Sequence, residues 1–182
     1  MLYVINNMEI WVEKCLNEAV KDLNMCKCDK CLKDVYALTL NRLKPKYIIA
    51  DKGIESEKVD FEFEKSKENI ISCIRECALI VSENPKHDIV ENDSVVNFEE
   101  LFVENYMKEI LKGNELINTD EYIRQIYVMV LNNIKPVYTV TKQGELYSKV
   151  NSNQGQYRTE IFLEITKAID IINMKIKKEN KN

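Results

Sequence analysis

The chain has 182 residues, 45% of them hydrophobic, and a formal net charge of −4. It is long enough to bury a core, and its charge balance argues against binding nucleic acid through the phosphate backbone. It has no run of 18 apolar residues and no basic leader before a long apolar core, which argues against a membrane span and a signal peptide. We therefore expect a cytoplasmic protein whose six cysteines are reduced thiols or metal ligands.

The first predicted element is an amphipathic helix over residues 5–23. Its apolar residues recur at three- and four-residue steps, which places them on one face. They are Ile5, Met8, Val12, Leu16, Ala19 and Leu23. A second helix begins near Leu32 and ends near Lys44, because Pro45 disfavours helical geometry in the residue before it.

Three cysteines, Cys26, Cys28 and Cys31, lie between these two helices. The two-residue spacing of Cys28 and Cys31 lets one turn present two thiolates to a metal ion, and Cys26 adds a third sulfur. Zinc prefers sulfur ligands, and the start of a helix favours ionised thiols. The segment therefore predicts one zinc site, with plain reduced thiols as the alternative.

Structural zinc takes four ligands, so one ligand is missing from this segment. The candidates for the fourth are Cys15, Cys73, Cys77, His87, a residue of another chain and water. Cys73 and Cys77 lie four residues apart on one helical face, and we interpret them as core residues. A redox role for Cys28 and Cys31 is disfavoured, because the βαβ context of thioredoxin-like motifs is missing.

After Pro45 the period of the sequence changes to two. We predict a β-hairpin with strands at Tyr47–Ala50 and Val59–Phe63 and a turn at Asp51–Gly53. A closing helix follows and ends at Pro85. Its buried face consists of Ile70, Ile74, Cys77, Ala78 and Val81.

The same succession returns 91 residues later, where Lys44, Pro45 and Tyr47 recur as Lys135, Pro136 and Tyr138. The second hairpin is predicted over 138–141 and Glu145–Val150. The second closing helix presents Ile161, Ile165, Ala168, Ile169 and Ile172. At the positions of the three cysteines the second copy has Ile117, Thr119 and Tyr122, so we expect metal in the first copy only.

The expected fold class is mostly α (α+β). Two copies of a helix–helix–β-hairpin–helix unit, residues 1–88 and 96–182, are joined by a linker at 89–95 and packed as an intramolecular pseudo-dimer.

A two-fold ligand suits a two-fold interface, and in such a ligand phosphates would need Lys or Arg whereas bases would need aromatic faces. The candidate ligand-binding residues are Arg42, Lys44, Lys46 and Tyr47 in the first copy, with Lys135 and Tyr138 in the second. The alternative interpretation is that the lysines are solvated and that both tyrosines pack at the base of the hairpins.

Both copies resemble the late competence development protein ComFB family. The first copy matches through Cys26-x-Cys28-x-x-Cys31-x-x-Asp34, through Leu40-Asn41-x-Leu43-x-Pro45-x-Tyr47 and through Asn84-Pro85-Lys86-His87, and the second through Leu131-Asn132-x-Ile134-x-Pro136-x-Tyr138. The resemblance implies a small helical domain, usually a homodimer, with zinc bound by the clustered cysteines. It also implies a non-enzymatic role linked to competence, motility or surface behaviour, and some relatives are thought to be cyclic dinucleotide receptors. This chain departs from the pattern because it is a tandem whose degenerate second copy lacks the cysteines.

The sequence leaves two functions open: a regulatory protein that binds a cyclic dinucleotide, and a protein-interaction adaptor with structural zinc and no small-molecule ligand. An enzyme is disfavoured, because the sequence has no glycine-rich phosphate loop and no legible catalytic grouping around its one histidine, His87. The expected partners are thus a cyclic dinucleotide or a protein, but no membrane and no nucleic acid. The expected state is a monomeric pseudo-dimer or a higher oligomer.

Overall fold

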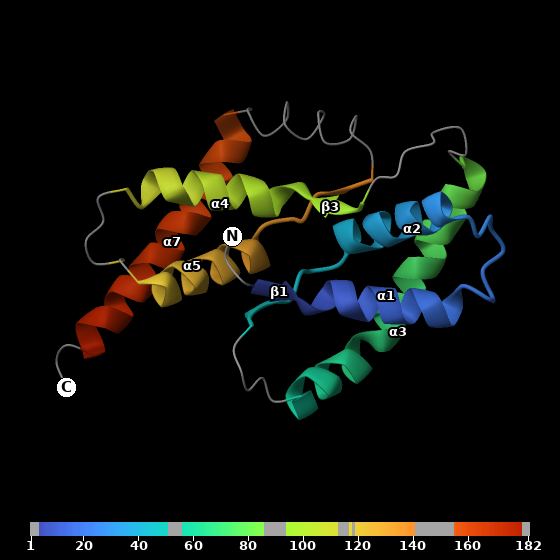
Figure 1. The fold of residues 1–182 in the computed structure, drawn as a ribbon, viewed down its shortest axis with the longest axis horizontal. Coiled ribbons are helices and arrows are strands. Elements are labelled where there is room, and N and C mark those ends of the chain that lie inside the picture. The colour runs from blue at the N-terminus through green and yellow to red at the C-terminus, as the bar shows by residue number, and fades with distance from the viewer. Residues whose placement is uncertain are drawn as a thin grey trace.

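The computed structural model describes residues 4–50, 56–85, 94–112, 117, 119–140 and 155–179. Within these residues the chain forms two repeats, each with three helices and a two-stranded antiparallel sheet. In Figure 1 the first repeat runs from blue to green and the second from yellow to red, and the short strands lie where the two repeats meet. The helical repeats confirm the predicted fold class. The exact boundaries of the units stay a prediction.

The order of elements is the same in both repeats. The first comprises β1 (Val4–Asn6), α1 (Asn7–Ala19), α2 (Asp29–Arg42), β2 (Tyr47–Ile49) and α3 (Ser56–Glu83). The second comprises β3 (Val96–Asn97), α4 (Phe98–Ile110), α5 (Asp120–Asn133), β4 (Tyr138–Thr139) and α7 (Gly155–Glu179).

An asparagine sets the start of the first helix in each repeat. Asn6 and Asn97 are extended N-cap residues, and the Oδ1 atom of each accepts a hydrogen bond from the backbone two residues on, at 3.2 Å. The predicted helix over residues 5–23 is therefore too long. Ile5 belongs to β1, and Leu23 lies beyond the end of α1, although its side chain is buried in the core.

The other helices follow the sequence closely. Helices α2 and α5 end three residues before Pro45 and Pro136, respectively, as the prolines require. The closing helix α3 ends at Glu83, just before Pro85. The predicted faces of both closing helices are buried, except that Ile169 is partly exposed.

The predicted hairpin of the first repeat is wrong. Residues Val59–Phe63 belong to α3, where Phe63 extends the buried helical face that continues through Ile70 and Ile74. The spacing of these residues is helical, and it outweighs the short alternation that suggested a strand. Strand β2 pairs instead with β1, the segment that precedes the first helix.

The second repeat uses the same arrangement, because β4 pairs with β3 and Asn97 lies opposite Tyr138. The predicted return strand at Glu145–Val150 lies outside the described residues, as does the predicted turn at Asp51–Gly53.

Each repeat has its own hydrophobic core, and each core contains one tyrosine from the other repeat. Tyr138, from β4, is 6% exposed and packs in the core formed by α1, α2 and α3. Tyr47, from β2, is 4% exposed and packs in the core formed by α4, α5 and α7. The repeats are therefore interlocked, and neither core is complete without the other repeat.

Asparagine side chains fix this exchange. The Asn41 amide binds the backbone of Tyr138 on both sides, accepting from its N–H at 2.6 Å and donating to its carbonyl at 3.0 Å. Asn132 binds Tyr47 in the same way, at 2.7 and 2.9 Å. Each side chain thus satisfies the backbone groups on the edge of a short strand that its sheet partner does not reach.

The two tyrosine hydroxyls form equivalent hydrogen bonds at the junction of the repeats. The Tyr138 hydroxyl donates to Glu9 Oε1 at 2.5 Å and accepts from Asn6 Nδ2 at 2.9 Å. In the second repeat the Tyr47 hydroxyl donates to Glu100 at 2.6 Å and accepts from Asn97 at 2.7 Å. Burial raises the pKa of both carboxyls, and the hydrogen bond from the tyrosine opposes this shift. We call these eight residues the inter-repeat lock: Asn6, Glu9, Asn41, Tyr47, Asn97, Glu100, Asn132 and Tyr138.

The lock predicts that removing one hydroxyl weakens the whole molecule. Tyr138→Phe keeps the buried ring but leaves the Glu9 carboxyl and the Asn6 amide without their partner, so we expect a loss of about 2–3 kcal/mol in the free energy of unfolding. Urea denaturation measures it. Tyr47→Phe should cost the same amount, because its contacts are equivalent.

Tyr122→Phe is the matched control, because the Tyr122 hydroxyl bonds to Glu179 on the exposed surface. We expect it to change the free energy of unfolding by less than about 0.5 kcal/mol. Equal effects at Tyr122 and Tyr138 would contradict the lock.

Candidate functional site

The three clustered cysteines lie where α1 connects to α2. Cys26 and Cys28 are in the connection and are exposed, whereas Cys31 is in the first turn of α2 and fully buried. Their sulfur atoms all lie within 4.8 Å of one another. Three thiolates that share a tetrahedral zinc ion lie about 3.8 Å apart, given Zn–S bonds of about 2.3 Å, so the group needs only a small adjustment. The donor set and the geometry both fit zinc.

The electrostatics of the cluster favour a metal over three free thiolates. Burial, together with the neighbouring Cys28 and Cys26, raises the pKa of the Cys31 thiol to about 12. Such a thiol loses its proton readily only when a cation takes its place. Cys28 is the N-cap residue of α2 and forms no side-chain cap bond, so its sulfur is not used to hold the helix end.

The remaining cysteines stand apart from this group. Cys15 and Cys77 are fully buried in the core of the first repeat, and Cys73 lies beside it with its sulfur 4.0 Å from the Thr39 carbonyl oxygen. Of the His, Cys, Asp and Glu side chains described, none joins the three-thiol group. His87 lies outside the described residues.

The second repeat holds the equivalent connection between its first two helices without thiols. Ile117 occupies the position of Cys26 and is 3% exposed, so it anchors the connection by packing. Thr119 occupies the position of Cys28, and its hydroxyl caps α5 by accepting from the Tyr122 backbone at 3.3 Å. A packed side chain and a helix cap thus stand where the first repeat has its sulfur cluster.

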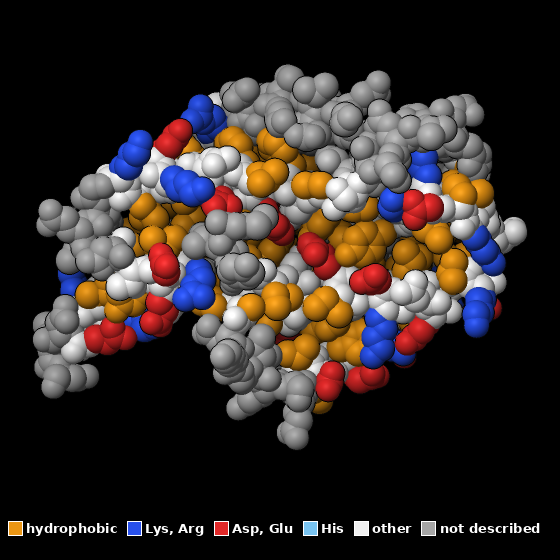
Figure 2. All heavy atoms as spheres, in the orientation of Figure 1, with side chains coloured by type: hydrophobic (Ala, Val, Ile, Leu, Met, Phe, Trp, Pro, Cys, Tyr) orange, Lys and Arg blue, Asp and Glu red, His pale blue; other side chains and the backbone are white. Residues whose placement is uncertain are grey.

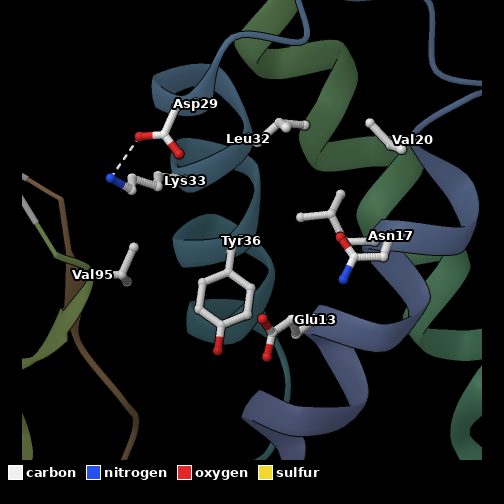
Figure 3. A pocket seen from close by; sticks show the side chains of 9 residues that line it. Glu13, Asn17, Val20, Asp29, Leu32, Lys33, Tyr36 and Val95 are labelled. Carbon is white, nitrogen blue, oxygen red and sulfur yellow. Dashed lines mark ion pairs between the residues drawn. The ribbon is translucent and has the colours of Figure 1, made fainter.

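A groove of about 360 Å³ lies between α1 and α2 and begins at the turn that holds the cysteines. Figure 3 shows Glu13 and Asn17 on α1 facing Tyr36 on α2, with Asp29 and Lys33 paired at the other end. A groove of about 350 Å³ recurs at equivalent residues of the second repeat, with Glu104 and Asp120 in place of Glu13 and Asp29.

Another groove, of about 380 Å³, lies across the junction of the repeats. It is lined by residues 41–45 of the first repeat and by the equivalent residues 132–136 of the second. Three of the predicted ligand-binding residues, Arg42, Lys44 and Lys135, are therefore brought together here. Arg42 is also 3.4 Å from Glu76, in an exposed ion pair.

The other three predicted residues lie elsewhere. Lys46 lines a different surface hollow and pairs with Glu62 at 3.3 Å. Tyr47 and Tyr138 are buried in the inter-repeat lock, so their rings already pack against protein. This placement agrees with the alternative interpretation of the tyrosines, in which they pack rather than stack on bases.

Sequence reasoning missed four residues of the lock, namely Asn6, Glu9, Asn97 and Glu100. They could have been found, since each recurs at the same 91-residue separation as the lysine–proline–tyrosine segment. In the sequence alone, these polar residues look like ordinary solvent-exposed positions, because the groups that they bind belong to the other repeat.

The surface shows mixed charge. On the face drawn in Figure 2, basic side chains lie dispersed among acidic and apolar ones. Among the described helices, none is long and apolar enough to cross a membrane.

Three comparisons place the chain among known proteins. The family model for late competence development protein ComFB matches residues 5–85 and again 96–175. The competence protein ComFB of Bacillus subtilis (strain 168) is 31% identical over 83 residues, which cover 45% of this chain and 85% of that protein. A solved structure of the late competence protein ComFB from Bacillus subtilis aligns with a TM-score of 0.40 and 25% identity, over 49% of this chain and 99% of that chain. Because the family model matches both repeats, this chain belongs to the late competence development protein ComFB family.

Proposed function

We propose that this protein is a cytoplasmic, non-enzymatic regulatory protein of the ComFB type, linked to competence or motility, in which zinc stabilises the first repeat. The observation that carries the zinc site is the group of three sulfur atoms within 4.8 Å. Zinc held by Cys26, Cys28 and Cys31 would tie the connection to the start of α2, which is the task that packing and capping perform in the second repeat. Its role is then structural.

The ligand we propose is a cyclic dinucleotide bound in the groove between the repeats. Lys44 and Lys135 are exposed there, at equivalent positions of the two repeats, and neither forms an ion pair with another described residue. Two ammonium groups related by pseudo-two-fold symmetry suit the two phosphates of such a ligand. Recognition would rest on the phosphates, because both candidate tyrosines are buried.

A second function, that of a protein-interaction adaptor, is supported by the groove between α1 and α2. Leu16, Val20 and Leu32 line it together with Glu13 and the Asp29–Lys33 ion pair, so it offers an apolar floor with a charged rim. Interfaces that bind short segments commonly combine such features.

Metal analysis tests the zinc site. Protein purified under reducing conditions without added metal should contain one zinc ion per chain. The triple variant Cys26→Ile, Cys28→Thr, Cys31→Tyr copies the second repeat and should contain none, whereas Cys73→Ser should retain the full amount. A chelator should lower the melting temperature of the parent protein but not that of the triple variant. A folded parent protein with free thiols and no stoichiometric zinc would rule the site out.

Calorimetric titration with cyclic di-GMP and cyclic di-AMP tests the ligand. We expect binding by the parent protein, and a dissociation constant at least about tenfold weaker in Lys44→Ala/Lys135→Ala, since a hydrogen bond to a charged group is worth about 1.5–3 kcal/mol. The control Lys177→Ala/Lys178→Ala removes the same charge from the exposed end of α7 and should bind normally. No heat at high micromolar ligand would remove this proposal and leave the adaptor.

Affinity capture tests the adaptor. A protein captured reproducibly by the parent chain should be lost with Leu32→Asp, which places a charge on the groove floor. It should be retained with Leu163→Asp, which changes an exposed leucine on α7. Loss with both variants, or with neither, would argue against this groove as the binding surface.

A further inference from the structure

Glu99 is a buried carboxylic acid that only the second repeat possesses. It lies in the first turn of α4 and is 2% exposed. The equivalent position of the first repeat is Met8, which is 6% exposed and packs in the core. One repeat thus places a titratable group where the other places an apolar side chain.

The carboxyl of Glu99 faces the start of the closing helix. Tyr157 and Glu160, both on α7, are the titratable groups that act on it. Neither Glu99 Oε2 nor the Tyr157 hydroxyl has a hydrogen-bond partner, although both atoms are buried, so the two groups lie close to each other but short of bonding geometry. No described lysine or arginine forms an ion pair with Glu99. Its charge would therefore be uncompensated.

The surroundings favour the neutral acid. Burial is the main cause that raises the pKa of Glu99 to about 7, the negative charge of Glu160 adds to it, and only Tyr157 acts in the opposite direction. A position in the first turn of a helix normally favours a carboxylate. Desolvation outweighs that preference here, because the side chain is almost completely removed from water.

Tyr157, which lies close to Glu99, belongs to an aromatic cluster between α4 and α7. The Tyr157 ring lies 5.5 Å from the ring of Phe102, which in turn lies 5.8 Å from Tyr106. This cluster holds the start of α7 against α4. A charge that draws water to Glu99 would therefore act on the packing of two helices.

We infer that Glu99 is a pH-sensitive latch between α4 and α7. Protonated, it lies neutral against Tyr157 and keeps the start of α7 packed on α4. Ionised, it draws water into that contact and loosens it. This inference is independent of the zinc and ligand sites, since none of its residues belongs to either.

The direction of the effect follows from proton binding. Between the ordinary carboxyl pKa of 4.5 and a folded pKa of about 7, the folded protein holds a proton that the unfolded chain has lost. The stability contributed by Glu99 is therefore complete below pH 4.5, declines as the pH rises through this window and is gone above pH 7. A difference of about 2.5 pKa units corresponds to a change of about 300-fold in the folding equilibrium constant.

Denaturation of the full chain between pH 5 and pH 8.5, at constant zinc, tests the latch. Glu99→Met copies the first repeat, and Glu99→Gln keeps the shape of the side chain without the charge. Relative to the parent protein, the folding equilibrium constant of both variants should increase by about 75-fold between pH 5 and pH 8.5, which is the part of the roughly 300-fold effect that falls in this window. Glu109→Gln, at an exposed position of α4, should show no such gain. A difference that stays constant with pH would overturn the inference.

Carbon NMR of the Glu99 carboxyl in the parent protein provides the second measurement, and it does not depend on a variant that folds. We expect a titration midpoint near 7, accompanied by chemical-shift changes at Tyr157 and Phe102. Tyr157→Phe should move the midpoint upward, because Tyr157 favours the ionised form. A midpoint below 5 would overturn the inference.

Discussion

The structure depends on two asparagine side chains that act as strand partners. Strands β2 and β4 are three and two residues long, and among the described residues each pairs with one other short strand. The amides of Asn132 and Asn41 occupy the opposite edges, binding the backbone of Tyr47 and Tyr138 from the other repeat. Without them, buried N–H and C=O groups would lose their partners, at a cost of about 1–3 kcal/mol each. The two repeats thus complete each other's sheets as well as each other's cores.

This arrangement explains the recurring segment in physical terms. The asparagine needs to be in the last turn of the second helix to reach across, and the proline needs to end that helix so that the chain can leave its own repeat. The tyrosine two residues later then enters the other core, where its hydroxyl donates a hydrogen bond to a half-buried carboxylate. The recurring asparagine, proline and tyrosine therefore specify how the two repeats associate, and their role cannot be seen in one repeat alone.

The helices were predictable because their information is local, whereas the lock was not. Buried faces such as Ile161, Ile165 and Ala168 follow from spacing along one helix. The paired residues of β1 lie 41 to 45 positions upstream of β2, in three residues that merge with the pattern of α1. The sequence of Val59–Phe63 alternates as a strand does, because this segment is too short to distinguish the helical period from the strand period. The cysteine cluster was readable from its spacing, but the location of Arg42, Lys44 and Lys135 in one groove required both repeats to be placed.

The differences between the repeats involve side chains that are not part of the lock. The lock has four positions, and each carries the same residue in both copies. Every lock residue forms a hydrogen bond with the opposite repeat, so a substitution at one position would leave a polar group of the other repeat without its partner. The connection to the second helix and the position shared by Met8 and Glu99 contain no lock residue. The first repeat can therefore carry sulfur ligands at the positions equivalent to Ile117 and Thr119, and Met8 at the position equivalent to Glu99. A fused pair keeps one symmetric junction and allows each half its own chemistry.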